Sequence, residues 1–277
     1  MERLPDIITF DLDGVLIQNP FRLGVFPHVC RELAPYGEAL GEIIAEAKRR
    51  LLAGLFVEAY DWDDIVATAA SRLCGAGGEA KSPSPPPPRF DIAALVRHYC
   101  AVPGMIWLLP GARETLMALR AERRRLGVVT NGYRKYQWPV LETLGIAEFF
   151  DVIVTPEEVP ATKPQPELFH AAWRDSRAPF HVGDDLVHDA WGARAAGGYS
   201  VWLHKDLPAS LLSVKPEERP AHPDFAAVRD KAFAKVMAVD SFGVGPEDCI
   251  PDAVVYGLSE VPKLLARLDA GSIKIPS

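Results

Sequence analysis

IITFDLDGVLIQNP, residues 7–20, is the stretch that decides the fold of this chain. Its first four residues are mostly apolar and favour extended structure, and they run directly into Asp11, Asp13 and Gly14. An apolar run without polar alternation is typical of a strand buried on both faces in a parallel sheet. Because carboxylates are costly to bury, two of them at the end of such a strand indicate a place where their charge is used.

Five more short apolar segments follow along the chain, at residues 126–130, 150–155, 180–183, 199–203 and 252–256. Helical patterns lie between them, at 111–125, 136–145, 166–176, 188–198 and 258–268. Regular alternation of buried strands and amphipathic helices predicts an α/β fold, a doubly wound parallel sheet with helices on both faces.

Residues 17–106 interrupt this alternation. Segments 37–56 and 61–74 place apolar residues three and four positions apart, which predicts helices. We therefore expect an α-helical cap domain at 17–106, inserted into an α/β core of residues 1–16 and 107–277. Within the insertion, KSPSPPPPRF (81–90) has five prolines in the six positions 83–88, which predicts an extended connector.

A second interruption spans about residues 204–251 and contains one predicted helix, at 222–239. It begins after a predicted strand, so we expect it on the side of the sheet where the strands end. The sequence leaves two roles open for it, a wall of the binding pocket or a contact between two copies of the chain.

Composition limits the possible classes of protein. The chain has 277 residues, 48% of them hydrophobic, and a formal net charge of −7. An acidic chain without a basic stripe is not expected to bind nucleic acid. No long apolar run or signal-peptide pattern occurs, so we expect no membrane span and a cytoplasmic location. The four cysteines lack zinc-site spacing and are expected to be reduced structural residues.

Polar residues cluster where the predicted strands end, which is where parallel α/β sheets bind their ligands. The residues in these positions, or just before a following helix, are Asp11, Asp13, Thr130, Asn131, Lys163, Asp184, Asp185 and Asp189. Carboxylate oxygens are the ligands that Mg²⁺ prefers, and a lysine among them could offset the charge of a phosphate.

The segments that carry these residues are DLDGV, TNG, KP and GDDLVHD. In this order they resemble the four motifs of the haloacid dehalogenase (HAD) superfamily. The resemblance covers about residues 5–204 and the last strand and helix, and it leaves the segment 204–251 unexplained. It implies a Rossmann-like core with an inserted cap, and the combination of four ordered motifs is far more specific than any one of them.

Attack of a carboxylate on a phosphoester meets a repulsion of about 4 kcal/mol at ~4 Å for an effective dielectric constant of about 20, so a divalent cation is needed. We therefore expect a Mg²⁺-dependent phosphomonoester hydrolase acting on a small phosphorylated metabolite. Asp11 would attack phosphorus to form an aspartyl-phosphate, and Asp13 would exchange protons with the leaving group and with water.

Further roles follow from the same hypothesis. Thr130 and Asn131 would hold phosphate oxygens, and Lys163 would offset charge on the nucleophile and the phosphate. Asp11, Asp184 and Asp189 are the candidate metal ligands, with Asp189 binding directly or through water. By the resemblance, the backbone carbonyl of Asp13 also binds the metal.

Other interpretations stay open at this point. Asp185 is expected to cap the following helix, and for Asp189 capping and metal binding are equally compatible with the sequence. A sugar phosphomutase or a haloacid dehalogenase of the same superfamily, or a non-catalytic binding protein that keeps the fold, are the alternative functions. Dehalogenation is disfavoured because Asp13 is present. The chain is expected to be a monomer or a homodimer.

Overall fold

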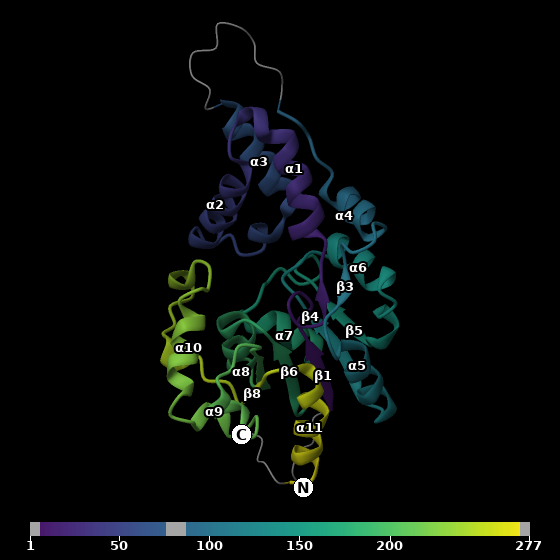
Figure 1. Cartoon of the computed structure of the whole chain (residues 1–277), viewed down its shortest axis with the longest axis vertical. Helices are drawn as coiled ribbons and strands as arrows, with labels where there is room; N and C mark the ends of the chain where they lie inside the picture. The colour runs from purple at the N-terminus through teal and green to yellow at the C-terminus, as the bar shows by residue number, and fades with distance from the viewer. Residues whose placement is uncertain (1–5, 76–86, 272–277) are drawn as a thin grey trace, which may run out of the picture. The chain divides into compact units, whose positions relative to one another are not determined.

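The computed structural model describes residues 6–75 and 87–271 and divides into two compact units (Figure 1). The α/β unit comprises Met1–Gln18, Leu108–Asn131 and Ile146–Ser277, and the helical unit comprises Asn19–Trp107 and Gly132–Gly145. The sequence predicted a cap domain at residues 17–106 and a core made of residues 1–16 and 107–277. In the structure, residues 132–145 also group with the helices, because the helix they form packs on a helix of the insertion.

A six-stranded parallel sheet forms the centre of the α/β unit, with the order β5-β4-β1-β6-β7-β8. Its strands are β1 (Ile7–Phe10), β4 (Arg125–Val129), β5 (Val152–Val154), β6 (Pro179–Gly183), β7 (Tyr199–Leu203) and β8 (Ala253–Val255). The doubly wound fold is confirmed. The chain runs outward from β1 to β5, then returns beside β1 and runs outward again from β6, so β1 lies at the point where the winding reverses.

The two faces of the sheet follow from side-chain alternation along β1. Ile7 belongs to a buried apolar cluster that includes Phe169 and Trp173 of α7 (Pro166–Trp173). Thr9 points the same way and accepts a hydrogen bond from the Trp173 indole. Ile8 and Phe10 are equally buried and point to the opposite face. Burial on both faces explains why β1 carries almost no polar residue before Asp11.

The remaining helices of this unit are α5 (Ala112–Ala121), α8 (Gly192–Ala195), α9 (Ala209–Leu212), α10 (Phe225–Phe233) and α11 (Val261–Asp269). The helix predicted at 111–125 ends at Ala121, because Arg123 adopts a left-handed conformation with φ of 60° and Arg125 begins β4. The helix predicted at 222–239 covers only Phe225–Phe233. Before α8, residues Leu186–Trp191 form a wide π-helical turn.

The helical unit contains α1 (Phe26–Leu33), α2 (Ala39–Leu52), α3 (Trp62–Gly75), α4 (Ile92–Cys100) and α6 (Arg134–Thr143). Two short strands, β2 (Ile17–Gln18) and β3 (Trp107–Leu108), pair where the chain leaves the sheet unit and returns to it. In the predicted proline-rich connector, residues 87–90 belong to no helix or strand, and 81–86 lie outside the described residues. Among the described residues, no helix combines the length and apolar character needed to cross a membrane.

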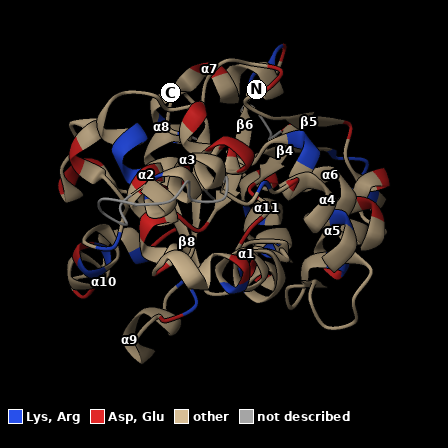
Figure 2. Cartoon of the chain, turned by 90° about the horizontal axis from the view of Figure 1, so that it is seen from above, with Lys and Arg blue, Asp and Glu red and all other residues tan. Residues whose placement is uncertain are grey.

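Buried ion pairs and aromatic contacts hold the helical unit together. Acidic and basic residues are mixed along its helices (Figure 2). Arg50 of α2 is buried and lies 3.0 Å from Glu46 and 2.5 Å from Asp64. Phe21 packs against Tyr136 of α6 with ring centroids 5.7 Å apart. These contacts explain why α6 belongs to this unit.

The segment 204–251 packs on the sheet through an apolar cluster that includes Trp202, Leu211, Phe225 and Val254. Arg219 is the buried cation of this segment. Its guanidinium donates two hydrogen bonds to the Glu260 carboxylate, at 2.7 and 2.8 Å, and others to backbone carbonyls. A bidentate pair of this kind is strong and directional.

We expect Arg219→Met to lower the free energy of unfolding by about 3 kcal/mol, because it leaves a largely buried carboxylate without its partner. Urea unfolding would measure the loss. The control is Lys215→Met, since Lys215 forms an exposed pair with Glu218 at 3.6 Å that is worth about 0.5 kcal/mol or less. Equal losses in the two variants would contradict the assigned role of Arg219.

Candidate active site

Asp11 leaves the end of β1 at the centre of the sheet. Its backbone N–H continues the sheet by donating to Val182 O at 2.9 Å. The chain then turns at Gly14, which has a φ of 83°, a conformation that glycine adopts without strain. A Cβ atom at Gly14 would lie 2.1 Å from Asp184 Oδ2. The glycine therefore lets the turn after β1 approach the acidic segment after β6.

Lys163 is the buried cation of the site, with 3% of its side chain exposed. Its Nζ lies 2.7 Å from Asp11 Oδ1 and 2.6 Å from Asp189 Oδ1. Asn131 holds the backbone of Lys163 on both sides: its Oδ1 accepts from Lys163 N at 2.6 Å, and its Nδ2 donates to Lys163 O at 3.2 Å. The asparagine side chain therefore fixes the lysine that bridges the two carboxylates.

Asp11, Asp184 and Asp189 form an acidic cluster, which we call the carboxylate cluster. One oxygen from each lies within 4.8 Å of the other two. Burial, strengthened by the charge of Asp189, raises the pKa of Asp11 to about 7 despite Lys163. Asp184 is exposed as a residue, yet partial desolvation of its carboxyl group and the charges of Asp11 and Asp189 raise its pKa well above the ordinary value. Such crowding favours binding of a cation.

Asp189 differs from the other two carboxylates because protein donors already surround it. Lys163 and His181 both contact Oδ1, the histidine through Nε2 at 3.1 Å, and the Asp185 N–H donates to Oδ2 at 3.0 Å. Although burial opposes the charged form, Lys163 and His181 hold the pKa of Asp189 below its usual range. Asp189 is therefore ionised and serves first of all to position Lys163.

His181 lies behind Asp189 inside the sheet and is fully buried. Burial lowers its pKa, so the ring is neutral near pH 7. Since a carboxylate oxygen can only accept, Nε2 carries the proton and donates to Asp189. Nδ1 then accepts from the Thr9 hydroxyl, 2.9 Å away, and Thr9 in turn accepts from the Trp173 indole at 3.1 Å. These contacts fix the orientation of Asp189.

The structure brings some of the residues predicted from the sequence into contact and leaves others outside the carboxylate cluster. Asp11, Lys163, Asp184 and Asp189 meet, and Asn131 contacts Lys163 through its side chain. Thr130 is buried at the end of β4. Asp13 is half-buried in the turn after β1, and its carboxylate is not part of the carboxylate cluster in the described residues.

Asp185 caps the π-helical turn, as expected, by accepting from the N–H groups of Val187 and His188, both at 2.8 Å. Sequence reasoning missed His181, although a histidine inside the otherwise apolar strand FHVG is a usable signal of a buried polar contact. It also missed Lys205, whose Nζ donates to Gly14 O at 3.2 Å. No pattern in the sequence pointed to that contact.

Comparison with known proteins agrees with this geometry. The family model described as haloacid dehalogenase-like hydrolase matches residues 5–197, which is more than half of the chain. The protein therefore belongs to the haloacid dehalogenase-like hydrolases, as its four motifs indicated.

Several relatives are named as phosphatases. The chain is 33% identical over 156 residues to a glyceraldehyde 3-phosphate phosphatase of Methanopyrus kandleri, covering 55% of this chain and 66% of that protein. It is 42% identical over 94 residues to a phosphoglycolate phosphatase of Nitrosospira multiformis, covering 32% and 41%. The matches thus span less than two thirds of these relatives. A solved HAD phosphatase from Thermococcus onnurineus shares the fold, with a TM-score of 0.59, 21% identity and coverage of 96% and 98%.

Removing the cation of the site should destabilise the protein in a pH-dependent manner. We expect Lys163→Met to cost about 3–5 kcal/mol, since it leaves two buried carboxylates without the cation that neutralises them. Their pKa values in the folded protein would then lie above the unfolded value, so the native state would bind more protons and stability would fall as pH rises from about 5 to 8. Unfolding in urea with EDTA at several pH values would measure this slope.

Lys135→Met is the matched control for this experiment. Lys135 also contacts two carboxylates, Asp61 at 3.1 Å and Asp63 at 2.8 Å, but its side chain is 35% exposed. Solvent screening should limit its loss to about 1 kcal/mol. A flat pH profile for Lys163→Met would show that Lys163 does not neutralise the carboxylate cluster.

Proposed function

We propose that this protein is a Mg²⁺-dependent phosphomonoester hydrolase that works through an aspartyl-phosphate. The observation that carries the proposal is the position of Asp11: it follows the central strand, and Lys163 holds it beside two further carboxylates. A carboxylate fixed in this way is suited to act as a nucleophile, and the Lys163 ammonium beside it is suited to the charge of a phosphate.

The donor set fits Mg²⁺. Asp11 and Asp184 offer hard oxygen ligands; burial, and after it the neighbouring negative charges, raises the pKa of both carboxyl groups, and a dication would relieve this crowding of charge. Asp189 has one oxygen occupied by Lys163 and His181, so it would contribute through Oδ2 or through a bound water. The backbone carbonyl of Asp13 completes the proposed protein ligands. When bound, the metal would screen the repulsion between Asp11 and the phosphate.

In the first proposed step, Asp11 attacks phosphorus and a new P–O bond forms as the bond to the leaving alcohol breaks. Lys163 contacts Oδ1, which leaves Oδ2 to attack. Asp13, protonated, donates its proton to the departing oxygen, so the alcohol leaves neutral. The Thr130 hydroxyl and the Asn131 backbone N–H would hold phosphate oxygens, and Lys163 would offset the charge of the phosphoryl group.

In the second proposed step, Asp13 accepts a proton from water, and the water oxygen attacks phosphorus of the aspartyl-phosphate. The bond between phosphorus and Asp11 breaks, inorganic phosphate leaves, and Asp11 returns to the carboxylate. Asp13 regains the proton that it donated in the first step, so the cycle balances. The single carboxyl group acts first as acid and then as base.

The substrate is proposed to be a small phosphorylated metabolite, on the basis of the relatives named as phosphatases of glyceraldehyde 3-phosphate and phosphoglycolate. The inserted helical unit is proposed to act as a cap that selects the leaving group and excludes water. The cytoplasmic location and the monomeric or homodimeric state remain predictions from the sequence.

Release of inorganic phosphate from a panel of phosphorylated sugars, acids and nucleotides tests the proposal. We expect release that requires Mg²⁺, stops with EDTA, and falls by about 10³-fold or more in Asp11→Asn, which lacks the nucleophile. The matched control is Asp185→Asn, because asparagine caps a helix as well as aspartate does and should keep near-normal activity.

Rapid acid quenching followed by mass measurement should find one phosphoryl group on the wild-type protein and none on Asp11→Asn. Transfer of the phosphoryl group back to a sugar would indicate a phosphomutase, and halide release from a 2-haloacid would indicate a dehalogenase. No turnover of any compound by the folded protein would support the non-catalytic alternative.

A further inference from the structure

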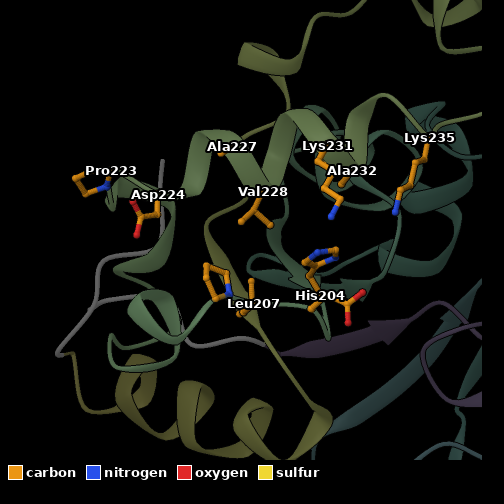
Figure 3. Close-up of a pocket in the computed structure, with 11 residues that line it drawn as sticks. His204, Leu207, Pro223, Asp224, Ala227, Val228, Lys231, Ala232 and Lys235 are labelled. Carbon is orange, nitrogen blue, oxygen red and sulfur yellow. The ribbon is translucent and has the colours of Figure 1, made fainter.

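The segment 204–251 lines a cavity of its own that is partly open to solvent, with a volume of about 690 Å³. The cavity lies between the loop after β7 and the helix α10 (Figure 3). Its principal lining residues are His204, Asp206, Leu207, Val228, Lys231 and Lys235. None of them belongs to the carboxylate cluster or to the groups proposed to hold phosphate, so the cavity is separate from the site described above.

Two lysines give one end of this cavity a positive charge. Lys231 lies in the last turn of α10 and Lys235 just after its end, and both ammonium groups point toward the side where His204 lies (Figure 3). In the part of the chain that the structure describes, the ammonium group of neither lysine forms an ion pair or a hydrogen bond. Like charges four residues apart repel, so an anion between them would stabilise the arrangement.

The carboxylates near the cavity do not neutralise these lysines. Asp224 lies at the opposite end, beside Pro223, and accepts a hydrogen bond from the Ser210 hydroxyl at 2.5 Å (Figure 3). Asp206 also lines the cavity and acts electrostatically on His204. In the described residues, however, it comes within ion-pair distance of neither lysine. The cationic end is therefore available to a ligand.

His204 forms the floor of the cationic end. Its ring stacks on the buried Trp202 with centroids 4.3 Å apart and an interplanar angle of 21°. Burial lowers the pKa of His204; the charge of Asp206 opposes this effect, and the smaller effects of Lys235 and Lys231 lower the pKa further. A neutral imidazole can donate a hydrogen bond to an anion from a fixed position.

The middle of the cavity is apolar. Leu207 is buried, and Val228 and Ala232 of α10 pack against the same apolar cluster as Leu207. Figure 3 shows Val228 and Leu207 between the lysine end and the Asp224 end. A ligand that fills this space needs an apolar body as well as a negative charge, because apolar walls with few polar groups are typical of small-molecule sites.

We propose that this cavity binds a small organic anion, with its anionic group on Lys231, Lys235 and His204 and its apolar body against Leu207 and Val228. This inference does not rest on the proposed hydrolase activity. It assigns a ligand-binding role to the segment 204–251, for which the sequence left a pocket wall or a contact between copies as the open choices.

Benzoate is the probe, and benzyl alcohol is its neutral counterpart of similar shape. The full-length protein is labelled with ¹³C-histidine and kept in EDTA, and the His204 ring signal is assigned by its loss in His204→Gln. We expect benzoate to move this signal saturably, with dissociation in the millimolar range, and benzyl alcohol to bind about tenfold more weakly or not at all. Equal binding of both compounds would overturn the proposal.

The double variant Lys231→Gln/Lys235→Gln tests the two cations. It should weaken benzoate binding by about tenfold or more and raise the pKa of His204, since two positive charges near the ring are removed. Lys215→Gln, an exposed lysine of the same segment that does not line the cavity, is the matched control and should change neither quantity. Unchanged binding in the double variant would contradict the proposal.

Asp11→Asn separates this cavity from the proposed catalytic site. Benzoate should bind this variant with unchanged affinity, whereas phosphate release is lost if the proposed function holds. Loss of benzoate binding in Asp11→Asn would mean that the anion occupies the carboxylate site, and it would overturn the assignment of the cavity. The two proposals can therefore fail independently.

Discussion

The α/β unit depends on one interaction, the contact of the Lys163 ammonium with Asp11 and Asp189. The three residues come from distant parts of the chain, and the negative charges of Asp11 and Asp189 would repel each other without the lysine. Nζ approaches both carboxylates within 2.7 Å, and the side chains of Lys163 and Asp189 are 3% and 1% exposed, so the Coulomb interactions are stronger than at the surface. Asn131 fixes the lysine backbone, so the end of β4 takes part in the same arrangement.

Residues around this interaction fix the orientation of the carboxylates and leave space for them to approach one another closely. His181 sets the orientation of Asp189 through a neutral ring whose tautomer follows from its two partners. Gly183 lacks a side chain where a Cβ atom would lie 2.0 Å from Asp189 Cγ, and Gly14 does the same beside Asp184. Small residues and a buried histidine thus allow three carboxylates to share one corner of the sheet.

The segment 204–251 is connected to this corner through the end of β7. Trp202 donates a hydrogen bond from its indole to the backbone carbonyl of Asp184 at 2.9 Å. The ring of His204, which lines the cavity beside α10, stacks on the Trp202 ring. Lys205, the next residue, bonds the carbonyl of Gly14. One short stretch therefore contacts the acidic segment, the turn after β1 and the cavity. The segment 204–251 is an integral part of the α/β unit, and Arg219 fixes it to β8 and Glu260 by hydrogen bonds.

The sequence by itself determined the six strands of the sheet, the parallel α/β fold and the family, and it predicted the polar residues Asp11, Lys163, Asp184 and Asp189 that the fold brings together, because apolar periodicity and the four short motifs are local signals. It overestimated the helix at 222–239, which covers only Phe225–Phe233, because residues 234–238 form turns and a bend that apolar periodicity does not reveal. Tertiary structure alone decided that His181 supports Asp189, that residues 132–145 join the helical unit, and that two lysines face a cavity. These features depend on contacts between residues far apart in the chain, and spacing along the sequence carries no information about such contacts.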